Sequence, residues 1–215
     1  SGGVVLASHN LPPLDSLHGK IIALDAGHGG GTTGAVNTKY GVVEADVNLD
    51  VVLALGQKLT DAGAIVVFTD RVSSRKQRVD GALEQCKLVA GRTCDVLVSV
   101  HHNGNIDPAH DGTLTIYTQN SDKPLAQSLL NSLVLRFGPS EGMLNGGYGM
   151  TVYKNLVSTI TEAYYITNDA KAFRYLNDPI VDGIRPLVLE EVDAQVAGLS
   201  NYFASQTGGK GGKPR

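Results

Sequence analysis

The chain has 215 residues, of which 42% are hydrophobic, 18% charged and 6% aromatic, and its formal net charge at pH 7 is -3. This length suits one domain with a sizeable core, and a weakly negative chain without Lys/Arg clusters argues against a nucleic-acid partner. No apolar stretch approaches the roughly 20 residues that span a bilayer, so we expect no membrane span.

We expect the catalytic domain to occupy residues 19–206, between two less regular ends. Residues 1–18 contain two prolines and no periodic apolar pattern, which predicts an extended arm. They also have neither a basic start nor a continuous apolar run, so no signal peptide is recognised in them. Residues 207–215 read TGGKGGKPR, a composition typical of a flexible tail.

Short apolar runs rich in β-branched residues alternate along the chain with segments of helical periodicity. The expected strands are 20–25, 64–69, 95–100, 113–118 and 156–161. The expected helices are 44–61, 79–90, 125–137 and a last one that starts at Pro186. Strands that alternate with helices predict an α/β fold, with a sheet that helices cover on both faces.

The two cysteines of the chain, Cys86 and Cys94, lie eight residues apart. They could form a disulfide in an oxidising compartment, but two reduced, half-buried thiols fit the sequence equally well. The sequence leaves both alternatives open.

Four residues with metal-binding or acid–base chemistry lie near the ends of expected elements. His28 follows the first strand by three residues inside LDAGHGGG, while His101 and Glu162 directly follow two later strands. The carboxyl ends of parallel strands meet at one edge of a sheet, and binding residues gather there. Glu44 stands at the start of a helix, where a carboxylate also suits the helix dipole. We therefore expect the four side chains to converge.

His28, Glu44 and His101 match a common ligand set of catalytic zinc, two histidines and one carboxylate with a fourth position for water. Zinc lowers the pKa of such a water towards about 7, and Glu162 is placed to move its proton to the leaving group. Neighbours along a strand point to opposite faces. We therefore expect His101 to face the ion and His102 to be structural.

Glycine-rich sequence surrounds His28. Gly27 and Gly29 would let the loop turn the imidazole inward. Residues 29–34 also spell GxGxxG, the fingerprint of dinucleotide-binding loops. That fingerprint needs a helix to begin within the motif, but helical periodicity starts only near Glu44, so we expect the match to be accidental.

Each candidate ligand also has an ordinary structural interpretation. A glycine-flanked histidine can be a turn residue, a glutamate that opens a helix can be a capping residue, and two histidines at a strand end can be solvated. Spacing alone does not decide between these interpretations and a zinc site.

Five motifs follow one another along the chain: DAGHGG, GVVEADVNLDVVLALGQKL, VFTDR, VLVSVHHNG and ITEAYYITN. In this order and spacing they resemble the zinc-dependent N-acetylmuramoyl-L-alanine amidases of the Amidase_3 family, and the resemblance covers roughly residues 20–203. It implies a single twisted, mostly parallel sheet of about six strands flanked by helices. It also implies one zinc ion per chain, bound by His28, Glu44 and His101, with Glu162 as the catalytic glutamate.

The resemblance implies a hydrolase that cuts the amide between N-acetylmuramic acid and the L-alanine of the stem peptide in peptidoglycan. A muropeptide substrate in turn implies an extracytoplasmic location, periplasmic, cell-wall or secreted, although a phage lysin would fit the same sequence. We expect a monomer. Two alternatives stay open: a non-hydrolytic peptidoglycan-binding module with the same groove, and a zinc peptidase that cuts within the stem peptide.

Some positions depart from the family pattern. Tyr164 stands two residues after Glu162, where the family usually has glycine, and His102 fills the commonly small second position of the HxN motif. A phenol at 164 could narrow the groove or stack on substrate, while local repacking would explain both departures as well.

Division-associated relatives carry a long helical insertion that covers the zinc. Between residues 104 and 156 this chain has room for one strand, one helix and a glycine-rich loop over 138–149. We therefore expect an open groove without an autoinhibitory helix, with that loop as one flexible wall.

Overall fold

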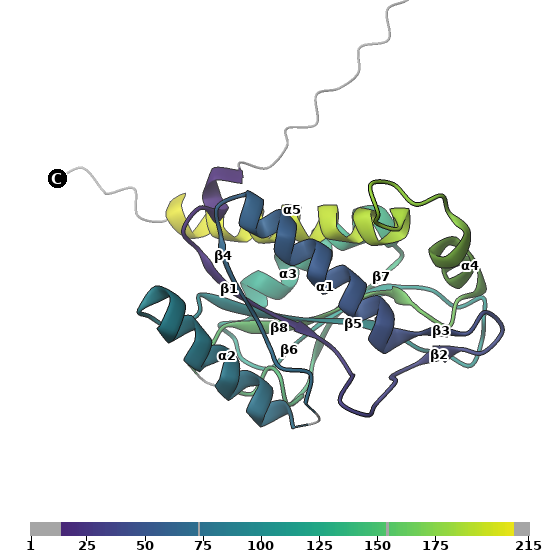
Figure 1. The fold of residues 1–215 in the computed structure, drawn as a ribbon, viewed down its shortest axis with the longest axis horizontal. Coiled ribbons are helices and arrows are strands. Elements are labelled where there is room, and N and C mark those ends of the chain that lie inside the picture. The colour runs from purple at the N-terminus through teal and green to yellow at the C-terminus, as the bar shows by residue number, and fades with distance from the viewer. Residues whose placement is uncertain (1–13, 73, 154, 209–215) are drawn as a thin grey trace, which may run out of the picture.

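A six-stranded sheet in the order β4-β1-β5-β8-β6-β7 organises residues 14–208, the part of the chain that this computed structural model describes, apart from residues 73 and 154 (Figure 1). Four neighbouring strands run parallel: β4 (Ile65–Phe68), β1 (Ile21–Ala26), β5 (Val96–Asn103) and β8 (Ser158–Tyr165). Next to β8, β6 (Thr113–Tyr117) runs antiparallel, and the edge strand β7 (Ser140–Asn145) runs parallel to β6. The sheet is mixed but mostly parallel, which confirms the predicted fold class.

Helices cover both faces of this sheet (Figure 1). On one face lie α1 (Glu44–Asp61), α3 (Lys123–Phe137) and α5 (Pro186–Gly208), and α2 (Arg75–Ala90) covers the other. The short helix α4 (Asp169–Asn177) contacts α5. A strand between two covered faces must be apolar on both sides, and all six residues of β1 are indeed buried.

Two strands reach further than their apolar runs predict. β5 extends to Asn103 and β8 to Tyr165, so His101 and Glu162 lie within strands instead of directly after them. An apolar run reports burial, whereas a strand ends where its backbone pairing ends. Here the pairing continues past the point at which the side chains become polar.

Several short elements were not predicted: the hairpin of β2 (Val36–Asn37) and β3 (Val42–Val43), the strand β7, the helix α4 and the 3-10 turn η1 (Leu14–Leu17). β7 occupies Ser140–Asn145, so the prediction of a flexible loop over 138–149 is wrong for these residues. As an edge strand it is half-exposed or exposed throughout, and its sequence SEGMLN therefore lacks apolar alternation.

The two ends of the chain are described only in part. The turn η1 contacts α5 within the segment predicted as an extended arm, and residues 1–13 of that arm lie outside the described residues. The helix α5 runs to Gly208, and residues 209–215 of the predicted tail also lie outside the described residues.

Cys86 and Cys94 form a disulfide, with their Cα atoms 5.4 Å apart. Of the two alternatives that the sequence left open, the structure selects the bridge. It joins the last turns of α2 to the segment that leads into β5.

We expect the double variant Cys86→Ala/Cys94→Ala to lose about 2–3 kcal/mol of unfolding free energy, because the bridge lowers the conformational entropy of the unfolded chain. Urea unfolding of the oxidised wild type and of the double variant measures the difference. A reductant should destabilise the wild type by a similar amount and leave the variant unchanged. Equal stability of the oxidised wild type and the double variant would contradict this prediction.

Candidate metal centre

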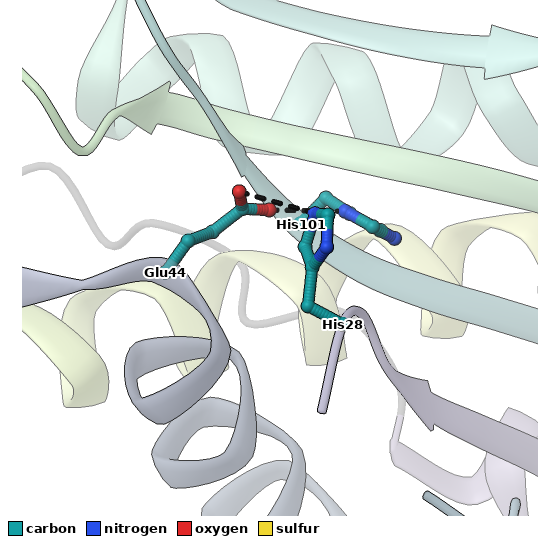
Figure 2. Close-up of side chains that lie close together, drawn as sticks. All are labelled: His28, Glu44 and His101. Carbon is teal, nitrogen blue, oxygen red and sulfur yellow. Dashed lines mark hydrogen bonds and ion pairs between the residues drawn. The ribbon is translucent and has the colours of Figure 1, made fainter. Parts of the chain in front are cut away.

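Three side chains of ligand type meet at the carboxyl end of the parallel strands (Figure 2). His28 comes from the loop after β1, Glu44 is the first residue of α1, and His101 lies on β5. Their potential ligand atoms all lie within 4.8 Å of one another. Glu44 Oε1 is 3.0 Å from His101 Nδ1, and Glu44 Oε2 is 3.2 Å from His28 Nε2. The fold thus gathers three groups that are far apart in the sequence.

The loop after β1 turns sharply to present His28. The φ angle of His28 is 62°, a left-handed conformation that is uncommon outside glycine, and the three glycines that follow, 29–31, also have positive φ. The guanidinium of Arg78 on α2 stabilises this turn by two hydrogen bonds to backbone carbonyls. Its Nη2 donates to the His28 carbonyl (2.5 Å) and its Nη1 to the Ala26 carbonyl (3.0 Å).

Two glycines leave the space that the ligand group fills. A Cβ added at Gly27 would collide with the imidazole of His101, and one added at Gly34 would collide with the Glu44 carboxylate and the ring of His28. The prediction that Gly27 serves the turn is therefore revised: its φ is not positive, and glycine is required there for close approach.

The Glu44 carboxylate is buried and accepts several hydrogen bonds. Oε2 accepts one from the backbone N of Ala35 (2.8 Å), and Oε1 accepts one from the backbone N of His102 (3.2 Å). Burial by itself would raise the pKa of this carboxyl, but hydrogen bonds with His101 and His28 hold the pKa well below its usual range. Glu44 is therefore an anion, the form in which a carboxylate binds a metal.

Glu162 lies on β8 directly beside His101, because the two residues are paired in register. Its side chain is half-buried, but its Oε2 atom is buried and has no hydrogen-bond partner among the described residues. Burial, followed by the negative charges of Glu44 and Glu191, raises the pKa of the Glu162 carboxyl well above its usual value. A raised pKa favours the protonated carboxyl, the form that a general acid needs.

A bulge in β8 decides where the next side chains point. Between the pairs His101–Glu162 and Asn103–Tyr165, β8 contains one residue more than β5. Tyr164 consequently points into the core, where it is fully buried 4.4 Å from the ring of His102. This overturns the suggestion that the phenol narrows the groove or stacks on substrate. The two departures from the family pattern contact each other and represent one local repacking.

The donor chemistry of the group fits a zinc ion. Two imidazoles and one carboxylate form the three-ligand set of many catalytic zinc sites. The side chains of His28 and His101 are 30% and 19% exposed, whereas Glu44 is only 4% exposed, so the group is closed on the carboxylate side and open on the histidine side. A pocket of about 480 Å³, which Arg75 and Met150 also line, adjoins the two histidines.

Sequence reasoning missed the residues that support the candidate ligands. Asp25 and Arg78 form a buried ion pair, with 3.1 Å between Oδ1 and Nη1. Asn48 is buried on α1, and its Nδ2 donates to the Gly27 carbonyl (2.9 Å) and to Glu44 Oε1 (3.3 Å). The spacing of Glu44 and Asn48, four residues apart on one helix face, was the available signal.

The glycine-rich motif over 29–34 does not open a helix. The chain forms an irregular loop there, and α1 begins only at Glu44. No helix N-terminus stands where a pyrophosphate would bind, so the dismissal of the GxGxxG match is confirmed.

Comparison with known proteins gives one consistent result. A model of the Amidase_3 family, described as N-acetylmuramoyl-L-alanine amidase, matches residues 22–183. The N-acetylmuramoyl-L-alanine amidase LytC of Bacillus subtilis (strain 168) is 28% identical over 162 residues, which cover 72% of this chain and 31% of LytC. The uncharacterized protein YqiI of the same organism is 27% identical over 197 residues, 88% of this chain and 87% of YqiI.

Among solved structures, the chain is similar to the catalytic domain of CwlV, an N-acetylmuramoyl-L-alanine amidase from Bacillus (Paenibacillus) polymyxa var. colistinus. The TM-score is 0.66 at 24% identity, and the match covers 88% of this chain and 98% of that domain. At this identity the likeness shows a shared fold. The chain thus spans about one catalytic domain, and less than a third of LytC.

We expect Gly34→Ala to weaken zinc binding about tenfold or more, because the new methyl group collides with the Glu44 carboxylate. Gly41→Ala is the matched control. Gly41 has nearly the same φ (67° against 69°), and a Cβ added there would meet no heavy atom within 4 Å. Both variants should lose about 1–2 kcal/mol of stability from the left-handed backbone. Competition with a chromophoric chelator measures zinc affinity, and an equal affinity of the two variants would contradict the requirement for glycine at position 34.

Proposed function

This chain belongs to the Amidase_3 family of N-acetylmuramoyl-L-alanine amidases, and we propose that it hydrolyses the amide between N-acetylmuramic acid and the L-alanine of the peptidoglycan stem peptide. We further propose that His28, Glu44 and His101 bind one zinc ion and that Glu162 is the catalytic acid–base residue. The observation that carries this proposal is the His28–Glu44–His101 group, whose donor atoms lie within 4.8 Å of one another.

The zinc ion would supply Lewis-acid polarisation of the amide carbonyl and a lowered pKa for water. Glu162 takes a proton from the attacking water and delivers it to the amide nitrogen as the C–N bond breaks. The products are a lactyl carboxyl group and the free amine of L-alanine. A nearby cation favours the ionised form of Glu162, and its burial favours the protonated form, so the carboxyl can serve as base and then as acid.

We propose that the active site is open. Among the described residues between 104 and 156, the only helix is α3, and it packs beside α5 on the sheet face opposite α2 (Figure 1). The exposure of His28 and His101 supports access from solvent. Met150 and Arg75 flank this access, and Gly149 packs against Arg75.

An extracytoplasmic location is also part of the proposal. Peptidoglycan lies outside the cytoplasmic membrane, and the Cys86–Cys94 disulfide suits an oxidising compartment. Within the described residues, every helix is too short or too polar to cross a bilayer.

The isolated protein should release stem peptides from purified cell walls without an added activator, because His28 and His101 stay partly exposed. Release of soluble peptide over time measures this activity. Complete latency that an added cell extract relieves would contradict the open site, while leaving the assignment as an amidase intact.

Glu162→Gln should keep one zinc per chain and reduce stem-peptide release by about 10²–10⁴-fold, since the amide cannot shuttle the proton. His101→Ala is the companion variant and should lose both zinc and activity. Zinc content by atomic emission and muropeptide release by chromatography give the two measurements.

The same assay separates the alternatives. A metal-free wild type that binds cell walls without cutting them would favour a binding module. Mass spectrometry of the products distinguishes an amidase, which leaves a lactyl carboxyl group, from a peptidase, which leaves a new terminus within the stem peptide.

A further inference from the structure

A buried row of polar side chains leads from α5 to the ligand Glu44, and the reaction described above does not use it. Asn48 on α1, His102 on β5 and Glu191 on α5 are each at most 1% exposed. His102 Nδ1 lies 2.7 Å from Asn48 Oδ1, and His102 Nε2 lies 2.8 Å from Glu191 Oε2. The row joins three elements that are distant in the sequence.

The hydrogen bonds of the row fix the orientation of each member. Both partners of Asn48 Nδ2, the Gly27 carbonyl and Glu44 Oε1, can only accept, so the amide oxygen must face His102. His102 therefore donates from Nδ1. Because its Nε2 faces Glu191 Oε2, the hydrogen bond between them requires one more proton, which lies between these two atoms. The second Glu191 oxygen accepts from Gln195 Nε2 at 2.9 Å, so the carboxylate is also held at its far side.

The row reaches all three candidate ligands. Asn48 contacts Glu44 itself and the carbonyl of Gly27, the residue before His28. His102 follows His101 on β5 and points to the opposite face of the sheet, so a fixed His102 also fixes the strand at His101.

A purely structural role does not account for these residue types. Burying a carboxylate, an imidazole and an amide is costly, and apolar side chains of the same volume often stabilise a core as well or better. Apart from Gln195, which donates to Glu191, the neighbouring buried positions are apolar, as Val51 on α1 and Val188 and Val192 on α5 illustrate. The polar row interrupts this apolar packing beneath the candidate ligands.

We propose that the His102–Glu191 pair is a positioning device that, through Asn48, holds Glu44 and the His28 loop in the arrangement that binds zinc. This inference rests on the proposed function. His102, Glu191 and Asn48 are positioning residues, since none of them touches the pocket that substrate enters.

The test compares zinc affinity in variants of the full chain. Glu191→Leu removes the acceptor for His102 and should weaken zinc binding about tenfold or more, the usual effect of losing a group that orients a ligand. Glu191→Gln keeps an oxygen acceptor and should stay close to the wild type. Val192→Ala, at the next position of α5, should lower the melting temperature and leave the affinity unchanged.

Glu191→Leu leaves a buried imidazole unpaired and can unfold the chain, so His102→Leu/Glu191→Leu provides a second test. Replacing both partners by apolar groups leaves neither of them unpaired and should keep the melting temperature near that of the wild type. The affinity should nevertheless fall about tenfold, because Asn48 is no longer held. Loss of affinity without loss of stability is the result that a structural role alone does not produce.

A double-mutant cycle shows whether the effect passes through Asn48. In an Asn48→Leu background the link to Glu44 is already broken, so adding Glu191→Leu should cause no further loss of zinc affinity. Cobalt substitution gives an independent signature: the visible absorption of bound Co²⁺ should change in Glu191→Leu and be restored in Glu191→Gln.

The outcomes separate this inference from the function on which it rests. If His28→Ala and His101→Ala lose zinc while Glu191→Leu and His102→Leu/Glu191→Leu bind it as the wild type does, the positioning role is overturned and the zinc centre stands. If the wild type does not bind zinc, or binds it equally well without His28 or His101, the proposed zinc centre fails and this inference fails with it.

Discussion

The organisation of the site depends on one buried charge, the carboxylate of Glu44. A carboxylate removed from water is stable only if hydrogen bonds and positive groups replace its hydration. Here the replacements come from separate parts of the fold: the backbone of Ala35 and His102, the amide of Asn48 and the imidazoles of His28 and His101. Because each partner must reach the same two oxygen atoms, α1, β5 and the loop after β1 are fixed relative to one another.

The alternation of β5 divides adjacent histidines between two environments. His101 faces the pocket and His102 faces α1 and α5, so one strand supplies a candidate ligand to one side and a buried hydrogen-bond partner to the other. β8 repeats this division only because of its bulge. Without the extra residue, Tyr164 would share the face of Glu162, whereas with it Glu162 stays beside His101 and Tyr164 packs against His102.

The sequence predicts those parts of this arrangement that buried apolar residues mark. The apolar runs locate β1, β5 and β8, and polar residues at their ends locate the candidate ligands, because a covered parallel sheet has few other places for them. The same signal fails for the ends of β5 and β8, where strand pairing continues through polar residues, and for β7, whose exposed edge needs no apolar pattern. Asn48 was missed because a single buried amide does not disturb helical periodicity.

The helix α2 has a small apolar face. Apart from Arg78, the buried residues of this helix are Val79, Ala82 and Cys86, which offer little apolar surface for 16 residues. Two other interactions compensate. The disulfide links the C-terminal half of α2 to the segment that leads into β5. The Arg78–Asp25 ion pair links the first turns of α2 to β1. Arg78 also holds the carbonyl of His28, so the group that anchors the helix also sets the loop. The anchoring of α2 and the conformation of the His28 loop therefore depend on the same side chain, so a change at Arg78 would affect both.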